Sequence, residues 1–416
     1  MSKFWSRRLC RLAGPFGGIW AAVVVAGFLT PAVAQAAAPT RVSCGVTVTA
    51  DTRLGADLVN CPNNGIVIGA DDITLDLNGH TVAGDGSPFP SCPEGVSCDI
   101  GIDNTAGHTG VTIRSGSVRE FDVAVFVLGG RENRLSRLSS AHNTSLSLAI
   151  GNSSDSRVDH NSSAEDGVVG ILTFDSHDMS IDHNSIRGTT GYAVPILRSS
   201  HIRVEQNRLS DNQHGFLLDC CDGNVFRGNR SDSGGGIEIG NAQNNRVEEN
   251  VLRNNGDSII LGNTKNTRVS DNRITGTGSV PSEAGGFGIL LDGGDHNLVQ
   301  RNTLTGGRGP AIFLTQLEAP SPPDHNVISH NTVNNNLVDG ILVDLAATAT
   351  LVERNTANSN GDNGIDVAAP GTTVTANTAN DNTDLGIKAV PGVIDGGGNK
   401  ASGNGNPAQC LNVRCR

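Results

Sequence analysis

Short runs of alternating apolar and polar residues recur along most of the chain, at an interval of about 22 residues. Each run is bounded by Gly, Asn and Asp, residue types that favour turns. The clearest marker is an asparagine that closes a segment such as Arg157-Val158-Asp159-His160-Asn161. It recurs at Asn184, Asn207, Asn229, Asn250, Asn272, Asn302, Asn331, Asn355, Asn377 and Asn399. Period-two alternation predicts short β-strands with one buried face, and no stretch shows the period of an amphipathic helix.

A repeat of this length cannot bury its own apolar face, so neighbouring repeats must stack. Most repeats also contain a Gly followed by Ile or Phe, as in Gly170-Ile171 and Gly215-Phe216. In a parallel stack, neighbouring turns lie about 4.8 Å apart and equivalent residues lie above one another. We therefore predict an all-β solenoid of about twelve turns, roughly 58 Å long. The stacked asparagines are expected to satisfy backbone groups at one bend, which is a structural role.

The repeat resembles that of the pectate-lyase-like superfamily of parallel β-helix proteins, over roughly residues 44–405. Residues 66–84, which include Asp76-Leu77-Asn78-Gly79-His80, resemble the first turn of such helices. The nearest group is the secreted carbohydrate-binding and sugar-hydrolase proteins, which include a copper-maturation protein. The resemblance implies a single right-handed parallel β-helix, a fold that hosts lyases, hydrolases, epimerases and non-enzymatic binders. Met179 is the one methionine outside the N-terminal signal, which excludes a Met-rich copper site.

The two ends of the chain predict export and capping. Residues 1–36 combine a basic start, an apolar stretch and a small-residue cleavage pattern, which is typical of an export signal; a single membrane anchor is the alternative. Residues 37–65 and 400–416 are expected to cap the repeats at 66–399. Eight cysteines lie outside the signal, and an even number favours disulfides in an exported chain. Proximity favours the pairs Cys44–Cys61, Cys92–Cys98 and Cys410–Cys415. For adjacent Cys220 and Cys221, a strained ring and two free or differently paired thiols both stay open.

Charge narrows the choice of partner. The formal net charge is −12, and loss of four cations with the signal leaves −16. Such a chain is a poor match for nucleic acid. It also disfavours a polyanionic substrate unless a divalent cation such as calcium bridges the charges. We expect a secreted or periplasmic monomer with no membrane-spanning segment after processing, whose partner is a polysaccharide or glycan and whose one candidate cofactor is calcium.

Candidate chemistry comes from acidic residues at outward positions. If the Ile and Leu of each Gly-Ile-x-Leu segment point inward, Asp219, Glu238 and Asp292 face out. Glycoside hydrolysis needs two carboxyl groups about 5–5.5 Å apart for retention or 6.5–9.5 Å for inversion. Asp219 with Glu238 is the best pair for the shorter distance, and His214 could serve as a general base. Two long turns, with insertions at Gly276–Gly286 and Leu317–Asp324, could wall one cleft; insertions without function are the alternative.

A second set of candidates lies near one bend. Asp175 and Arg198 occupy equivalent positions and should stack, with Asp219 near the same column one turn later. Such a ladder could form an acid/base site or a calcium-and-arginine lyase site, but a solvated ion-pair ladder is the favoured alternative. Asp175, Asp178 and His183 offer carboxylate and imidazole ligands for a metal. Stacked polar residues on a solvated edge are the alternative to that metal site.

Known enzyme signatures of this fold are incomplete. His214-Gly215-Phe216 departs from the Gly-His-Gly segment of polygalacturonase-like hydrolases, and Pro323-Asp324-His325 keeps only a scrambled fragment of the Asp-Pro-His-Asp segment of alginate epimerases. The Arg-Pro element of pectate lyases is absent. Two interpretations therefore stand: an exported polysaccharide hydrolase or calcium-assisted lyase or epimerase, and a non-catalytic module that binds glycan or protein along its face. The second rests on the apolar outward positions Leu217, Ile260, Leu290, Phe313 and Leu342.

Overall fold

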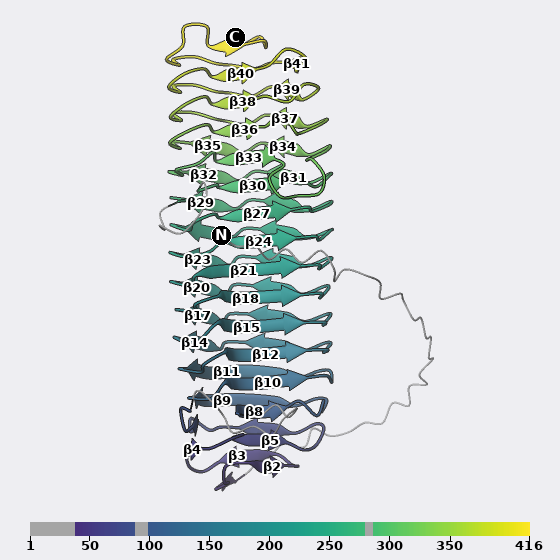
Figure 1. The fold of residues 1–416 in the computed structure, drawn as a ribbon, viewed down its shortest axis with the longest axis vertical. Coiled ribbons are helices and arrows are strands. Elements are labelled where there is room, and N and C mark those ends of the chain that lie inside the picture. Colours follow the sequence, from purple (N-terminus) through teal and green to yellow (C-terminus); the bar gives the residue numbers. More distant parts are fainter. Residues whose placement is uncertain (1–37, 88–98, 279–285) are drawn as a thin grey trace, which may run out of the picture.

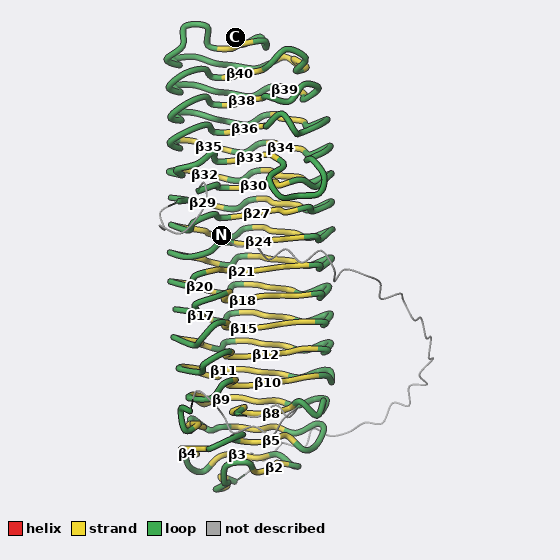
Figure 2. Tube along the Cα trace, viewed as in Figure 1, coloured by secondary structure: helices red, strands yellow, loops and turns green. Residues whose placement is uncertain are grey.

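The computed structural model describes residues 38–87, 99–278 and 286–416. In these residues the chain forms short strands joined by turns, with no helix, and the strands stack into one long solenoid (Figures 1 and 2). Every pairing between them is parallel, so the predicted all-β parallel solenoid is confirmed. The predicted export signal and the pair Cys92–Cys98 lie outside the described residues. Within the described part of the chain, no helix is long and apolar enough to cross a membrane.

Sheet B contributes one strand to each turn and forms one continuous face of the solenoid. Its sixteen strands are β2 (Val46–Val48), β5 (Ile66–Ile68), β8 (Ile100–Asn104), β10 (Val123–Leu128), β12 (Leu146–Gly151), β15 (Val169–Phe174), β18 (Tyr192–Leu197), β21 (His214–Asp219), β24 (Ile237–Gly240), β27 (Ile259–Gly262), β30 (Ile289–Asp292), β33 (Ile312–Thr315), β36 (Ile341–Val343), β38 (Ile365–Val367), β40 (Ile387–Ala389) and β42 (Cys410–Leu411).

Sheet A forms the rest of the wall as two parallel ladders, which are joined by the eight-residue strands β9 (Thr112–Arg119) and β11 (Arg134–Ala141). The first ladder adds β1 (Pro39–Thr40), β3 (Thr52–Leu54), β6 (Thr74–Asp76), β13 (Arg157–Asp159), β16 (Ser180–Asp182), β19 (Arg203–Glu205), β22 (Val225–Arg227), β25 (Arg246–Glu248), β28 (Arg268–Ser270), β31 (Leu298–Gln300), β34 (Val327–Ser329), β37 (Leu351–Glu353), β39 (Thr373–Thr375) and β41 (Ile394–Gly397). The second adds β4 (Leu58–Cys61), β7 (Thr81–Gly84), β14 (Ser162–Ala164), β17 (Ser185–Arg187), β20 (Arg208–Ser210), β23 (Arg230–Asp232), β26 (Val251–Arg253), β29 (Arg273–Thr275), β32 (Thr303–Thr305) and β35 (Thr332–Asn334).

The solenoid has about fifteen turns, more than the twelve that the repeat predicts. The difference lies at the two ends. Strand β2 pairs with β5, and β42 pairs with β40, so the segments predicted as caps continue the same sheet. These end turns lack the repeated asparagine, which is why the sequence pattern does not count them.

Each turn bends at residues in the left-handed backbone conformation. In one turn these are Arg198, His201, Gln206 and Asp211, with φ of 48°, 55°, 54° and 56°. The conformation costs little for Gly and is tolerated best by Asn, Asp and His among other residues. Gly, Asn and Asp therefore suit these bends, although Arg198 and Gln206 show that other residues also occupy them.

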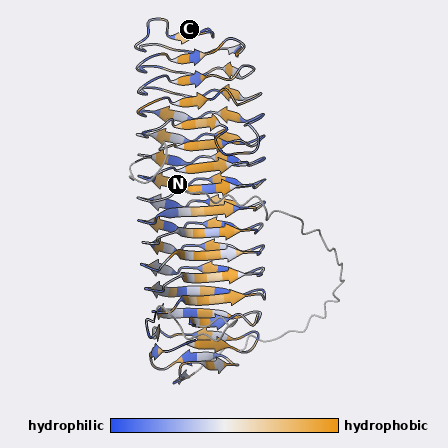
Figure 3. Ribbon diagram, in the orientation of Figure 1, coloured by the Kyte–Doolittle hydropathy of each residue, from blue (hydrophilic) through white to orange (hydrophobic). Residues whose placement is uncertain are grey.

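The core is a continuous column of Val, Ile and Leu. Figure 3 shows hydrophobic residues concentrated in the strands and hydrophilic ones in the connections. Few aromatic side chains take part; Phe216 and Phe226 make an edge-to-face contact, with ring centroids 5.7 Å apart. Cys221 also lies in this column as a buried free thiol, where burial raises its pKa to about 12. The adjacent pair Cys220–Cys221 therefore does not form a ring.

The repeated asparagine forms the predicted stack. Asn184 shows the pattern: its backbone N–H and its Nδ2 both donate to Oδ1 of Asn207 in the next turn, at 2.9 and 3.0 Å. Its Nδ2 also donates to the carbonyl of Val158, at 2.9 Å. The same bonds continue from Asn161 to Asn399. Since these side chains are buried, the structural role predicted for them is confirmed.

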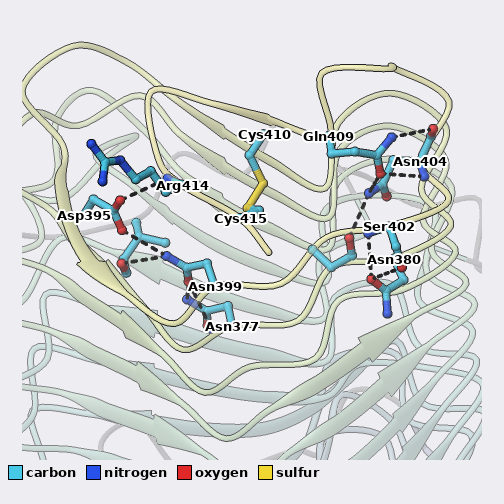
Figure 4. The surroundings of a disulfide bond; sticks show 12 residues. Asn377, Asn380, Asp395, Asn399, Ser402, Asn404, Gln409, Cys410, Arg414 and Cys415 are labelled. Atoms are coloured by element: carbon cyan, nitrogen blue, oxygen red, sulfur yellow. Dashed lines mark hydrogen bonds between the residues drawn. A yellow bond between two sulfur atoms is a disulfide. The ribbon is translucent and has the colours of Figure 1, made fainter.

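A second ladder of asparagines, which the sequence analysis missed, runs beside the first. Asn336, Asn360, Asn382 and Asn404 are joined in the same way, each through Nδ2 and Oδ1 of the next turn. At the C-terminal end, Oε1 of Gln409 takes the place of the next asparagine and accepts both donors of Asn404, at 3.1 and 2.8 Å (Figure 4). Gln409 therefore ends this ladder with its donors satisfied.

Disulfides lie near both ends of the solenoid, as predicted. Cys44 and Cys61 are joined at the first turns, and Cys410 and Cys415 at the last (Figure 4). Beside the second disulfide, Asp395 accepts the backbone N–H of Arg414, at 3.0 Å. These bonds hold the final segment across the end of the apolar column.

The ladder predicts a large stability cost for its interruption. Asn207→Ala should leave buried donors and acceptors without partners in both neighbouring turns, which lowers the free energy of unfolding by about 3 kcal/mol or more. The measurement is the urea midpoint at constant pH. Gln213→Ala, a truncation of an exposed amide in the same turn, is the control and should leave the midpoint almost unchanged. Equal midpoints for the two variants would show that the ladder contributes little.

Candidate active site

The outward face of sheet B carries a row of apolar side chains that contains one acid. Pairing between successive strands aligns Leu217, Glu238, Ile260, Leu290, Phe313 and Leu342. We call this set the apolar row. Its side chains are half-buried, apart from Leu290, which is 6% exposed. Glu238 therefore lies between Leu217 and Ile260, in surroundings that solvate a carboxylate poorly.

A tyrosine from two turns away binds this carboxylate. Oη of Tyr192 on β18 donates to Oε2 of Glu238 on β24, at 2.8 Å. His214, which pairs with Tyr192 on the intervening strand, stacks on the phenol ring with centroids 4.7 Å apart. The imidazole is exposed, whereas Tyr192 and Glu238 are half-buried. Three side chains from three consecutive strands thus form one connected group.

Burial raises the pKa of Tyr192 well above its usual value, and the charge of Glu238, their hydrogen bond and the charge of Asp219 raise it further. The phenol therefore keeps its proton and acts as a hydrogen-bond donor. Its donation fixes the orientation of the Glu238 carboxylate, because the tyrosine ring is itself held by the imidazole of His214.

A second carboxyl group with an altered pKa lies in the turn before β27. Burial raises the pKa of Asp257, and the charge of Glu238 adds to this effect. The backbone N–H of Phe287, which donates to Asp257 at 2.8 Å, opposes it. Two neighbouring carboxyl groups with different environments are the arrangement that allows one to act as an acid and the other as a base.

The connection into β24 is made of three glycines because the chain passes very close to its neighbours. A Cβ at Gly235 would collide with the backbone of Gly215, and one at Gly236 with the carbonyl of Ser258. This connection belongs to the shortest repeat, 21 residues from Asn229 to Asn250. The tight path brings the strand that carries Glu238 directly against the backbone that follows His214.

Asp219 faces outward on β21, as predicted, and its Oδ1 accepts a hydrogen bond from Asn241 at 3.2 Å. The sequence analysis expected Asp219 and Glu238 to form a close pair in adjacent turns, but the two residues are not aligned with each other. Leu217 pairs with Glu238 and Asp219 pairs with Gly240, so the two acids are diagonal neighbours. Strands 4.8 Å apart and an offset of two residues place their Cα atoms about 8 Å apart. The two acids are therefore not aligned with each other, and the expected carboxyl distance stays a prediction.

Asp175 and Arg198 stack and form a bidentate ion pair, with both N–O distances at 2.7 Å. The hydrogen bond from Arg198 lowers the pKa of Asp175. Asp219 pairs with Leu197, the residue before Arg198, so it lies one position away from the stack of Asp175 and Arg198. Because the two side chains are 39% and 37% exposed, the pair matches the solvated ion-pair ladder that the sequence analysis favoured over a lyase site.

The residues proposed as metal ligands do not gather around one point. Asp178 and His183 line a shallow hollow of about 640 Å³ beside β16 and β19, together with Arg157, Asp182 and Arg203, whereas Asp175 is engaged by Arg198. Asp178 binds His177, and His183 binds Asp182, each at 2.9 Å. In residues 38–87, 99–278 and 286–416, no group of three or more His, Cys, Asp or Glu side chains could hold a metal ion.

Asp292 has a structural contact that the sequence pattern does not show. Its carboxylate accepts the backbone N–H groups of Leu317 and Glu318, at 2.7 and 3.0 Å, and so fixes the start of the second long turn. Most of the first long turn, residues 279–285, lies outside the described residues, so the proposed cleft between the two turns stays a prediction.

Of the predicted catalytic residues, the structure brings Glu238, His214 and Asp219 into one neighbourhood and places Asp175, Arg198 and Asp292 in other contacts. The sequence analysis missed Tyr192 and Asp257. The sequence held one signal for Tyr192. It is the single tyrosine of the chain, and it occupies the position in its repeat that His214 occupies in the next repeat.

Comparison with known proteins identifies the fold family. A family model described as "Right handed beta helix region" matches residues 100–234 and 230–383. No curated protein matches the chain.

Among solved structures, the A-module of the mannuronan C-5 epimerase AlgE6 of Azotobacter vinelandii is similar, with 14% identity, 74% of this chain and 91% of that chain covered, and a TM-score of 0.46. The alginate lyase AlyF-OU02 is similar with 11% identity, 88% and 83% coverage, and a TM-score of 0.49. The tailspike protein of E. coli bacteriophage HK620 shows 13% identity, 84% and 73% coverage, and a TM-score of 0.46.

The raised pKa of Asp257 predicts a pH-dependent gain in stability when its charge is removed. A carboxyl group that binds its proton more tightly in the folded state destabilises that state once the pH exceeds the unfolded pKa. Asp257→Asn keeps an acceptor for the N–H of Phe287 but carries no charge. Its thermal midpoint should exceed that of the unmodified protein at pH 7, and the two should coincide near pH 3, roughly one unit below the usual aspartate pKa.

Asp211→Asn is the control for this comparison. Asp211 is exposed and lies at a bend with φ of 56°, which asparagine also tolerates, so its midpoint should not change at either pH. A lower midpoint for Asp257→Asn at pH 7 would mean that the folded state needs the ionised carboxylate at this position.

Proposed function

We propose, from the premise that the chain belongs to the right-handed β-helix family, that it is an exported enzyme that hydrolyses a polysaccharide on the outward face of sheet B. The observation that carries the proposal is the hydrogen bond from Tyr192 to Glu238, within a row of otherwise apolar side chains. A half-buried carboxylate on an open face has no role in the ladders that hold the solenoid together.

The proposed reaction uses two carboxyl groups in different roles. The Glu238 carboxylate removes a proton from a water molecule, whose oxygen attacks the anomeric carbon. The glycosidic bond breaks, and the departing oxygen takes its proton from Asp257, whose raised pKa suits a proton donor. Tyr192 is a positioning residue, since it orients Glu238 and keeps its own proton. Asp219 and His214 belong to β21, the strand that pairs with the strand of Glu238.

Hydrolysis is favoured over calcium-assisted elimination or epimerisation by the residues at hand. Elimination with calcium needs a set of carboxylate ligands around the ion, and Asp175, Asp178 and His183 do not form one. Arg198, the arginine nearest to Asp219, is bound to Asp175. Calcium is therefore left out of the proposed reaction.

Export and a monomeric state complete the proposal. The disulfides Cys44–Cys61 and Cys410–Cys415 support export, because such bonds persist in oxidising compartments. The fourteen or more turns between them already supply a continuous core without a partner subunit.

A second candidate function is a non-catalytic module that binds glycan along the same face. The apolar row supports it, because a line of half-buried Leu, Ile and Phe side chains can pack against sugar rings without any chemistry. The two candidates differ in whether Glu238 is needed for turnover or only for contact.

Loss of the Glu238 charge tests the enzyme proposal. The protein is incubated with a panel of polysaccharides, and new reducing ends are measured. Glu238→Gln should lower kcat about 100-fold or more on any polymer that is cleaved, because general base catalysis contributes an effect of this size. Asp366→Asn is the matched control: Asp366 lies farther along the same outward row, bound to Lys388, and its loss should leave kcat unchanged. If polymers bind but none of them yields new reducing ends, the non-catalytic module is favoured instead.

The role of Asp257 is tested with an activated substrate. A proton donor matters less when the leaving group is a weak base. Asp257→Asn should therefore lose activity on the polymer but keep most of it on the 4-nitrophenyl glycoside of the same sugar, whereas Glu238→Gln should lose both. If Asp219→Asn shows this selective loss and Asp257→Asn does not, Asp219 is the proton donor instead.

A further inference from the structure

We infer that the polysaccharide bound on sheet B is electrically neutral, built from uncharged sugars without uronate, sulfate or phosphate groups. This inference rests on the proposed function, and it concerns the charge of the face that contains Glu238.

The sixteen strands of sheet B carry almost only negative charge. Their charged side chains are five carboxylates and one ammonium group: Asp103, Asp219, Glu238, Asp292, Asp366 and Lys388. Lys388 is bound to Asp366 at 2.8 Å, so it offers no free positive charge to a ligand. Asp257 adds another carboxyl group beside Glu238. A polyanionic chain laid along this face would bring like charges together over several turns.

Cations at the margins of sheet B do not compensate this charge. Arg198 follows β18 and is held by both oxygens of Asp175. Arg308 lies in the turn before β33 and is exposed, three strands away from Glu238. The sequence segments 88–98 and 279–285 contain no Lys or Arg.

Every arginine that lies on a strand of the described residues belongs to sheet A. Arg203, Arg208, Arg246 and Arg273 are exposed on strands of sheet A, which the bends with positive φ separate from sheet B. Positive charge is thus available to the protein but is placed where a ligand on sheet B cannot reach it. The acidic character of sheet B is a local property as well as a consequence of the net charge.

The apolar row supplies the contacts that a neutral sugar chain needs. Uncharged pyranose rings bind through their C–H faces on apolar side chains and through hydroxyl groups on carboxylates. Ile260 and Phe313, which are half-buried, follow Glu238 along the row, and Phe287 lies against Phe313 with ring centroids 5.3 Å apart. Carboxylates that accept hydrogen bonds from hydroxyl groups do not need a cation on the ligand side.

The test uses Glu238→Gln, which should hold a polymer without cleaving it, and matched pairs of neutral polysaccharides and their carboxymethylated forms. Binding is measured at 20 and 500 mM NaCl, with calcium chloride and separately with a chelator. We expect Kd for the neutral form to change less than about twofold with salt. The carboxymethylated form should bind at least tenfold more weakly at low salt, and the difference should shrink at high salt.

Two further variants, made in the Glu238→Gln background, test whether the charge of sheet B causes the preference for the neutral form. Asp219→Asn should narrow the preference for the neutral form, because it removes a repulsive charge next to the site. Arg308→Ala should leave the binding of both forms unchanged, because this arginine is not a ligand contact.

Tighter binding of a polyuronate, with or without calcium, would overturn this inference and leave the proposed hydrolase standing if the unmodified protein cleaves that polymer. Loss of binding in Arg308→Ala would also overturn it, because a cation at the margin would then recognise the ligand. The absence of binding and cleavage across all neutral and charged polymers would overturn both the inference and the proposed function.

Discussion

The structure depends on one repeated interaction, the buried hydrogen bond from each ladder asparagine to the Oδ1 atom of its equivalent in the next turn. The bond fits only when equivalent residues lie one strand spacing apart, so it fixes the register of the whole turn. The bond also forms when additional residues are present elsewhere in the repeat. Asn272 and Asn302 are 30 residues apart and Asn302 and Asn331 are 29 apart, yet the bonds between them remain at 2.9 and 3.0 Å. The extra residues of the two long repeats therefore leave the stack of asparagines intact.

A fixed register turns each outward position into a column that runs along the solenoid. Neighbouring side chains in a column must be compatible at a separation of about 4.8 Å. Glu238 breaks this rule, since it stands between Leu217 and Ile260 in the apolar row. Its oxygen finds a donor only because Tyr192 reaches across the strand of His214. The site is thus a local exception within a regular wall, and its polar contacts come from two turns away.

The period of the asparagines was sufficient to predict the solenoid, the strand positions and the inward and outward faces. It undercounted the turns, because the end strands β2 and β42 join sheet B without a ladder asparagine. In the site, alternation predicted the outward direction of Asp219 and Glu238. It could not predict Tyr192, whose contact depends on side-chain reach over 46 residues and not on the repeat. Nor could it assign Asp292, because the backbone groups of the long turn that bind this carboxylate carry no sequence signal.

The position of the site along the solenoid follows from where the repeat changes length. Before Asn207 successive ladder asparagines are 23 residues apart, and from Asn331 onward the steps shorten from 24 to 22. The shortest repeat, 21 residues, contains the glycine connection into β24 and Glu238, and the two longest follow after one repeat of 22. A uniform repeat can only build a uniform wall, whereas a shortened or lengthened repeat changes the connections between its strands. The departures from a uniform repeat therefore fall between β18 and β33 in the described residues, which is where the side chains connected to Glu238 lie.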